Sequence, residues 1–156
     1  MSEEDLIEGE VSAQGRRIAV VAARFNDFIV ASLLKGARAA WLARGGAAHD
    51  LTVVRVPGAF ELPVVARKLA ASGRFDAVVA LGCVIRGDTP HFDYVAGEAA
   101  RGLQLAGLET GVPVAFGVLT VDSLEQALER AATTAGNKGG EAMESALEMA
   151  AVMARL

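Results

Sequence analysis

The stretch FDAVVALGCVI, residues 75–85, is an almost unbroken run of apolar side chains. It lacks the alternation of apolar and polar positions that marks a strand with one face in water. A strand of this kind is covered on both faces, which is typical of a parallel sheet packed between helices. Three more runs predict strands of the same sheet: RRIAVVAARF at 16–25, DLTVVRV at 50–56 and VPVAFGVLT at 112–120.

Segments with a helical spacing of apolar residues separate these runs. The first, IVASLLKGARAAWLARGG at 29–46, ends in a glycine pair that stops a helix. Further helices are predicted over AFELPVVARKLAASG (59–73), FDYVAGEAARGLQLAGLETG (92–111), DSLEQALERAATTAG (122–136) and GGEAMESALEMAAVMARL (139–156). This order predicts an α/β, three-layer, flavodoxin-like fold with a four-stranded, mainly parallel sheet flanked by helices. We expect residues 1–156 to form one domain, with residues 1–15 as an acidic N-terminal arm.

Composition excludes several classes of function. The formal net charge of −4 and the lack of a basic cluster argue against a nucleic-acid partner. The apolar runs are too short for a membrane span and the acidic start is unlike a signal peptide, so we expect a cytoplasmic protein with no membrane contact. The single cysteine, Cys83, fits a reducing compartment and is expected to be buried filler in its strand. Two histidines and one cysteine are too few for a structural zinc site, and no metal is expected.

The carboxyl ends of the predicted strands are the expected ligand site, because open α/β sheets bind ligands there. Phe25, Phe60 and Phe116 fall at these ends, the fourth strand being expected to end near Phe116 and Gly117. Aromatic faces gathered at one edge predict a flat pocket that stacks on a planar ring. The alternative is that these side chains merely cap the core, and the residues alone leave both interpretations open.

The turn Gly87-Asp88-Thr89 follows the strand at 75–85 and leads into a helix. Backbone N–H groups and a threonine hydroxyl at a helix start favour an anion such as phosphate. His91 is expected on the same loop, where an imidazole that changes charge near neutral pH suits proton transfer. A surface or helix-capping histidine is the alternative. The sequence holds neither G-x-x-x-x-G-K-[ST] nor G-x-G-x-x-G, which argues against nucleotide and dinucleotide sites.

Five motifs, in this order and spacing, resemble the 6,7-dimethyl-8-ribityllumazine synthase family: RFN, VPGAFELP, CVIRGDTPHFDYV, GVLT and AGNKG. The resemblance covers the chain from about residue 8 to residue 156. It implies an enzyme, without cofactor or metal, that condenses 5-amino-6-(D-ribitylamino)uracil with 3,4-dihydroxy-2-butanone 4-phosphate in the penultimate step of riboflavin biosynthesis. The alternative is a non-catalytic flavodoxin-like module that binds flavin or forms a container. That alternative does not explain why His91, Arg130 and Lys138 all match the family in register.

The resemblance implies roles on the side of the pyrimidine and its ribityl chain. Phe25 is implied to stack on the pyrimidine ring, and Glu61 to reach the ribityl hydroxyls. Cys83, Val84 and Ile85 are implied to contact the pyrimidine through their backbone. The other residues implied on this side are Ala59, Phe60, Phe116 and Lys138.

For the second substrate, the resemblance implies a phosphate site and a proton-transfer residue. The residues implied to bind phosphate are Gly87, Asp88, Thr89 and Arg130, and the catalytic residue is His91. Arg130 is implied to come from a neighbouring subunit, together with Phe116 and Lys138. A planar guanidinium fork suits phosphate oxygens, which agrees with the role of Arg130.

The resemblance also implies a homo-oligomer with active sites between subunits. Members of the family form pentamers, and some stack as decamers or build icosahedral shells of twelve pentamers. In shell formers the bend between the last two helices usually reads GTKAGN, whereas residues 132–137 here read ATTAGN. The unchanged length favours the shell, and the missing glycine and lysine favour the free pentamer. The arm is expected to add a strand to a neighbouring subunit's sheet, and association with riboflavin synthase is implied.

Overall fold

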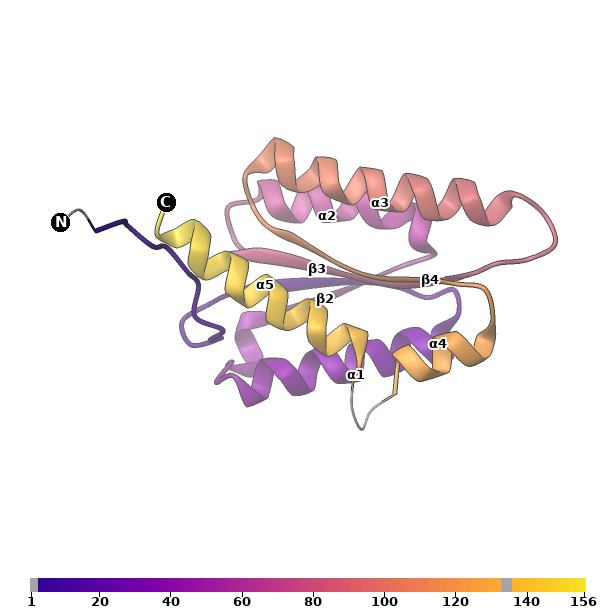
Figure 1. The fold of residues 1–156 in the computed structure, drawn as a ribbon, viewed down its shortest axis with the longest axis horizontal. Coiled ribbons are helices and arrows are strands. Elements are labelled where there is room, and N and C mark those ends of the chain that lie inside the picture. Colours follow the sequence, from indigo (N-terminus) through magenta and orange to yellow (C-terminus); the bar gives the residue numbers. More distant parts are fainter. Residues whose placement is uncertain (1–2, 133–135) are drawn as a thin grey trace.

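The computed structural model describes residues 3–132 and 136–156. A four-stranded parallel sheet in the order β2-β1-β3-β4 lies at its centre, with helices on both faces (Figure 1). The strands are β1 (Ile18–Ala23), β2 (Leu51–Val56), β3 (Ala77–Ile85) and β4 (Val114–Val121). Every residue of β1 is buried, and so is all of β3 except its last residue. The predicted three-layer α/β fold is therefore confirmed.

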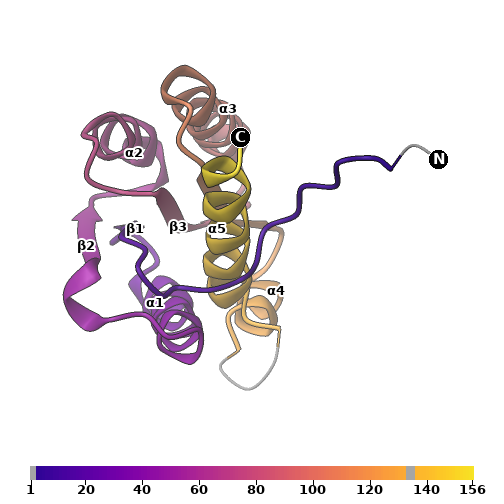
Figure 2. The same ribbon diagram turned by 90° about the vertical axis from the view of Figure 1, so that its left-hand side faces the viewer.

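Helices cover both faces of the sheet (Figures 1 and 2). One face carries α2 (Leu62–Ala71) and α3 (His91–Thr110), and the other carries α1 (Asp27–Ala43), α4 (Leu124–Arg130) and α5 (Lys138–Ala154). Short 3₁₀ turns at Ala48–Asp50 and Ala59–Glu61 precede β2 and α2. Each face has its own apolar cluster, so burial of the sheet on both sides holds the strand ends in place.

Asn137 and Gly139 fix the start of α5 against α1. The Asn137 Nδ2 group donates to Ser32 O at 3.0 Å and to Ala131 O at 3.2 Å. A β-carbon on Gly139 would overlap Leu33 O, so glycine is what lets the two helices approach so closely. Asn137 and Gly139 are therefore packing residues that set where α5 begins.

The end of β4 differs from the prediction. The strand was expected to end near Phe116 and Gly117, but it continues to Val121. Gly117 therefore lies inside the strand. A β-carbon there would lie 2.6 Å from Leu81 Cδ2 and 2.8 Å from Ala80 O, so a larger residue would not fit. This glycine allows β4 to pack closely against its neighbours, and Phe116 consequently lies near the start of the strand.

Two helix boundaries also differ from the prediction. The helix expected over 122–136 ends as α4 at Arg130. His91 was expected on a loop, but it is the first residue of α3. The bend at 132–137, on which the comparison with shell formers depends, includes residues 133–135, which lie outside the described residues.

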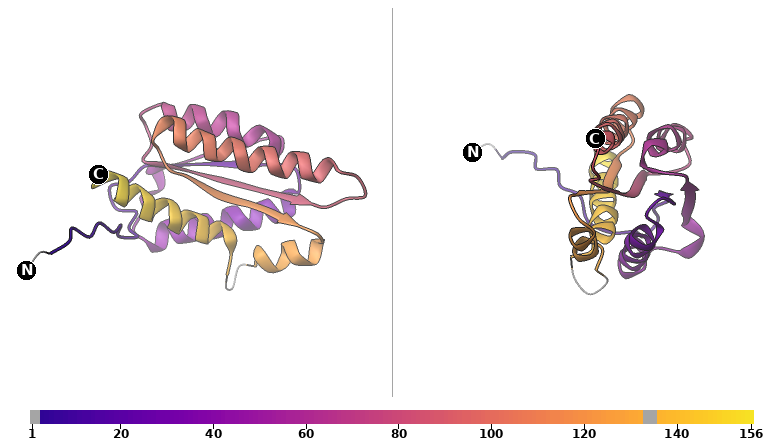
Figure 3. Two further views of the ribbon diagram at one scale, coloured as in Figure 1. Left: turned by 45° about the horizontal axis from the view of Figure 1, so that its top comes forward. Right: turned by 90° about the vertical axis from the view of Figure 1, so that its right-hand side faces the viewer.

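The N-terminal arm divides into an outer and an inner part. Residues 3–10 are neither helix nor strand, and the outermost of them extend away from the body of the molecule (Figures 2 and 3). Arg155 Nη1 donates to Glu8 O at 3.0 Å, and a β-carbon on Gly9 would overlap Glu148 O, so the arm meets α5 at these two residues. Farther along, Ala13 is buried and its N–H donates to Arg44 O at 3.0 Å, so the chain joins the core before β1 begins. Within the described part of the chain, no helix combines the length and the apolar character needed to cross a membrane.

Candidate active site

The carboxyl ends of β1 and β3 meet the first turn of α3 at a cavity of about 260 Å³. Residues that the sequence singled out form most of its wall: Phe25, Ala59, Cys83, Val84, Ile85, Gly87, Thr89 and His91. The remaining lining residues are Asn26, Phe92 and Val95. The parallel sheet thus brings together side chains from four separate segments of the chain, as expected for ligand sites at strand ends.

A second hollow, of about 530 Å³, adjoins the first and shares Phe25, Ala59, His91 and Val95 with it. Its other lining residues are Pro57, Gly58, Phe60, Glu61 and Tyr94. Phe25 and Phe60 are 72% and 58% exposed, which is high for phenylalanine at the rim of a cavity. Aromatic faces held in this way are available to stack on a planar ligand.

The turn after β1 holds Phe25 in place. The Phe25 N–H donates to Pro57 O at 2.9 Å, which extends the pairing of β1 with β2 beyond the strands. Asn26 then has φ 63°, a left-handed conformation that asparagine adopts more readily than most residues. Its Nδ2 group donates to Cys83 O at 2.8 Å, so the side chain ties this turn to β3 and does not cap α1.

Arg55 in β2 braces the same turn. Its Nε donates to Ala22 O at 3.3 Å, and its Nη2 lies 2.6 Å from Asp27 Oδ1 in the first turn of α1. One side chain therefore joins the end of β1 to the start of α1. These contacts limit how far the exposed ring of Phe25 can move.

Glu61 lies on the 3₁₀ turn before α2 and lines the larger hollow. A β-carbon on Gly58 would lie 3.2 Å from Glu61 Oε1, so the glycine leaves room for the carboxylate to approach the backbone. An ionised carboxylate accepts hydrogen bonds and donates none. This position suits a ligand that presents hydroxyl groups.

His91 is exposed at the point where the two hollows meet. It begins a helix of 20 residues whose N-cap, Pro90, offers no side-chain cap. The first N–H groups of a helix carry partial positive charge and favour an anion. A histidine beside such an anion site can exchange protons with a ligand while its phosphate is held or released.

Cys83 lines the smaller cavity, and its thiol is neutral near pH 7. The residue is buried, and burial raises the pKa of the Cys83 thiol to about 11. The thiol is therefore neutral near pH 7, whereas a nucleophilic cysteine needs the thiolate form. The expectation of a buried filler side chain is confirmed.

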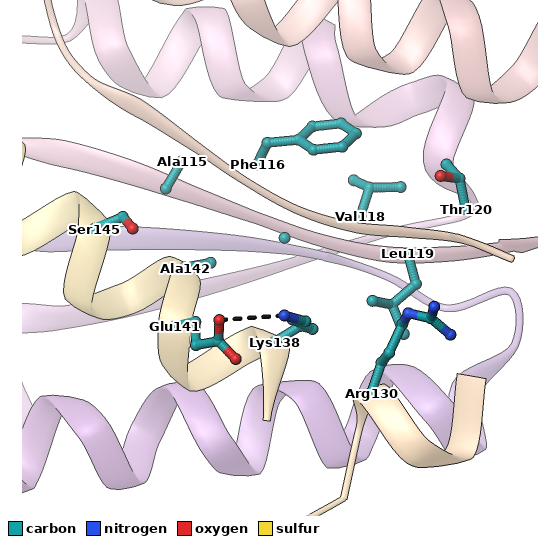
Figure 4. Close-up of a pocket in the computed structure, with 11 residues that line it drawn as sticks. Ala115, Phe116, Val118, Leu119, Thr120, Arg130, Lys138, Glu141, Ala142 and Ser145 are labelled. Carbon is teal, nitrogen blue, oxygen red and sulfur yellow. Dashed lines mark hydrogen bonds and ion pairs between the residues drawn. The ribbon is translucent and has the colours of Figure 1, made fainter. Parts of the chain in front are cut away.

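Phe116, Arg130 and Lys138 line a different cavity, of about 400 Å³, beside the edge strand β4 (Figure 4). Phe116 projects from β4 on the side opposite to Arg130 and Lys138 (Figure 4). Arg130 Nη1 donates to Gln126 O at 3.2 Å, and Lys138 Nζ lies 3.3 Å from Glu141 Oε1. This cavity therefore carries two cations and shares no residue with the cavities at His91.

The described residues thus place the predicted site in two separate groups, and Asp88 lines none of these cavities. Sequence reasoning missed Asn26, Tyr94 and Val95 as lining residues. Tyr94 and Val95 follow His91 at helical spacing, which places them on one face of α3 and would have revealed them. Across residues 3–132 and 136–156, no three His, Cys, Asp or Glu side chains are grouped as ligands for a metal ion.

Comparison with known proteins gives concordant matches. The family model described as 6,7-dimethyl-8-ribityllumazine synthase matches residues 15–154. A curated 6,7-dimethyl-8-ribityllumazine synthase from Nitratidesulfovibrio vulgaris (strain DSM 19637 / Miyazaki F) is 58% identical over 151 residues. The match covers 96% of this chain and 96% of that relative, so it includes all the cavities described above.

Proposed function

Since the chain belongs to the 6,7-dimethyl-8-ribityllumazine synthase family, we propose that the hollows at the ends of β1 and β3 form the pyrimidine half of its active site. The enzyme is a transferase of riboflavin biosynthesis. It condenses 5-amino-6-(D-ribitylamino)uracil with 3,4-dihydroxy-2-butanone 4-phosphate to 6,7-dimethyl-8-ribityllumazine and releases phosphate and water. The observation that carries the proposal is the grouping of seven predicted pyrimidine and ribityl residues around two adjoining hollows: Phe25, Ala59, Phe60, Glu61, Cys83, Val84 and Ile85.

Phe25 is the proposed stacking partner of the pyrimidine ring. Its side chain is exposed, yet its backbone is tied to Pro57, so an apolar face is presented in a defined place. The backbone at Cys83, Val84 and Ile85 supplies the polar contacts to the ring edge. Phe60 and Glu61 border the larger hollow, where the ribityl chain fits and the carboxylate accepts from its hydroxyls.

The phosphate is proposed to bind at the turn Gly87-Asp88-Thr89 and to pair with Arg130 of a neighbouring subunit. N–H groups at the start of α3 favour the anion, and a guanidinium adds two parallel donors to its oxygens. Within one chain, Arg130 lies in a different cavity from His91. A neighbouring subunit is therefore the natural source of this arginine, and of Phe116 and Lys138 with it.

His91 is the proposed proton-transfer residue. The substrate amine attacks the ketone, and loss of water gives an imine. A proton then leaves the hydroxyl-bearing carbon as phosphate departs, which leaves an enol. Protonation of this enol on carbon gives a new ketone, and the second substrate nitrogen adds to that ketone and closes the ring with loss of a second water. His91 can take up and return protons in these steps, which contributes roughly 10²–10⁴-fold. Holding both substrates in line adds on the order of 7–11 kcal/mol in well-aligned cases.

A pentamer is the proposed minimal active unit, because the two halves of the site lie in separate cavities of each chain. Apolar side chains exposed on α3 and α5, such as Leu108 and Met149, are consistent with burial against further subunits. The extended arm is proposed to add a strand to the adjacent sheet. Assembly into a shell, association with riboflavin synthase, a cytoplasmic location and folding as one domain stay predictions.

A steady-state assay with both substrates, monitored by the absorbance of the lumazine product, tests the proposal. Product that forms only when both substrates are present supports it. A protein that binds flavin or forms particles without turnover would favour the non-catalytic module. Light scattering and negative-stain microscopy on the same sample distinguish the assemblies: small discs indicate pentamers and hollow spheres indicate shells.

A further inference from the structure

Arg86 makes several contacts around the proposed phosphate turn, and the proposed reaction gives this residue no role. It directly follows β3, and its guanidinium reaches two other segments. Its Nε lies 2.9 Å from Asp122 Oδ1, just after β4, and its Nη1 lies 3.5 Å from Asp93 Oδ1 in the first turn of α3. Its Cζ also lies 4.4 Å from the centre of the Phe92 ring, a cation–π geometry.

The turn that these contacts surround has little packing of its own. Residues 87–90 are all exposed, and a β-carbon on Gly87 would meet nothing within 4 Å. The turn is anchored at its start, where the Arg86 N–H donates to Val121 O at 2.8 Å. Beyond the turn, Arg86 stacks on the Phe92 ring and pairs with Asp93, the two residues after His91. The same side chain thus bridges both ends of the turn.

We propose that Arg86 is a positioning residue that holds the phosphate turn and His91 in register with α4 without touching the substrate. The assignment rests on the proposed role of the turn in binding phosphate. Asp122 and Asp93 occupy two edges of the guanidinium, so its charge is already paired on the protein. The hydrogen bond that Arg86 donates to Asp122 raises the pKa of Arg86 further, so the group stays charged throughout.

The contacts continue from Arg86 to the second cavity. The Asp122 N–H donates to Gln126 Oε1 at 2.7 Å, and Gln126 O accepts from Arg130 Nη1 at 3.2 Å. Arg130 is the cation proposed to serve the neighbouring site. Arg86 is therefore linked to both elements proposed to bind phosphate. Among the described residues its contact with the pyrimidine cavity is the Phe92 ring, and no contact joins it to Phe25 or Glu61. Its loss should affect the phosphorylated substrate selectively.

A direct contact between Arg86 and the phosphate is the rival interpretation, and Asp122 distinguishes the two. Asp122→Asn removes a negative charge close to the site. If Arg86 binds phosphate directly, freeing its guanidinium from Asp122 should tighten binding of the anion. If Arg86 positions the turn, loss of this ion pair should weaken binding, although the site becomes more positive.

The experiment compares wild type with Arg86→Gln, Asp122→Asn and the double variant, with KM measured separately for each substrate and Ki for inorganic phosphate. In Arg86→Gln we expect KM for the butanone phosphate and Ki for phosphate to rise roughly 3–30-fold, the range seen for residues that act through contact networks. KM for the pyrimidine should change less than about twofold. Asp122→Asn should also raise KM for the butanone phosphate and Ki for phosphate. In the double variant these two constants should be no higher than in Arg86→Gln alone.

Arg74→Gln is the matched control, because Arg74 lies just before β3 and its Cζ is 4.9 Å from the centre of the Phe75 ring. It removes a similar cation–π contact at the opposite end of the strand and should leave all three constants unchanged. A lower KM for the butanone phosphate in Asp122→Asn, or wild-type constants in Arg86→Gln, would overturn the assignment. Should Arg86→Gln fail to fold, Asp122→Asn still distinguishes the two interpretations, because KM for the butanone phosphate rises if Arg86 positions the turn and falls if it binds the phosphate. A wild type without turnover would instead contradict the proposed function.

Discussion

The cavity at the ends of β1 and β3 and the cavity beside β4 are built differently. The first is formed by strand ends and tight turns, with the aromatic residues Phe25 and Phe92 in its wall beside His91. The second takes its charge from side chains at the ends of α4 and α5, Arg130 and Lys138. The first suits a flat, largely neutral ring, and the second suits an anion. This difference agrees with the proposal that each chain supplies one site with its ring-binding half and another site with its cations.

The largest expected effect on activity comes from His91→Ala, a change in the first cavity. Loss of proton transfer should lower kcat roughly 10–10³-fold, because general acid–base catalysis accounts for only part of the acceleration. The KM for the pyrimidine should change little, since Phe25 and the strand ends still bind it. Steady-state kinetics with each substrate varied in turn provide the measurement. Wild-type turnover in this variant would remove His91 from the mechanism.

Arg130→Ala alters the second cavity. If Arg130 pairs with the phosphate, KM for the butanone phosphate should rise roughly 10–100-fold, the range expected for lost charge-assisted hydrogen bonds. Inorganic phosphate should compete with this substrate in wild type and compete poorly in the variant. Arg67→Gln, which breaks the 2.9 Å ion pair with Glu109 between α2 and α3, is the control and should leave both KM values unchanged. Equal changes for both substrates in Arg130→Ala would mean a structural role.

Sequence patterns predicted the first cavity better than the second. Buried strands without alternation locate the carboxyl ends of β1 and β3, so Phe25, Cys83 and His91 are brought to one edge by topology alone. The second cavity depends on close contacts that a single sequence does not show. The fourth strand was expected to end near Gly117, yet this glycine lies within β4 and allows it to approach β3. Likewise, the Asn137 side chain donates to Ala131 O just after α4, a contact that the sequence pattern does not predict.

Mixing the two variants tests whether the two cavities belong to different subunits. His91→Ala and Arg130→Ala chains, refolded together in equal amounts, should form some sites with both halves intact. In a ring about a quarter of the sites are of this kind, since each site draws its two halves independently. The mixture should therefore recover up to about a quarter of wild-type activity, above either variant alone. Activity equal to the average of the two variants would place both halves in one chain.

The smallest effect on activity is expected at Cys83, which belongs to the first cavity through its backbone. Cys83→Ala should keep kcat within about twofold of wild type, because a neutral thiol supplies no charge or nucleophile. Burial raises the thiol pKa from 9.0 to about 11, so the rate of alkylation by iodoacetamide should climb about tenfold per pH unit between pH 8 and 10. In urea the rate should level off nearer pH 9, since the unfolded thiol ionises first. Between these two pKa values the unfolded chain binds fewer protons, so Cys83 lowers the stability of wild type as pH rises through that window. An alkylation rate that is already level at neutral pH would reveal a thiolate and would bring Cys83 into the chemistry.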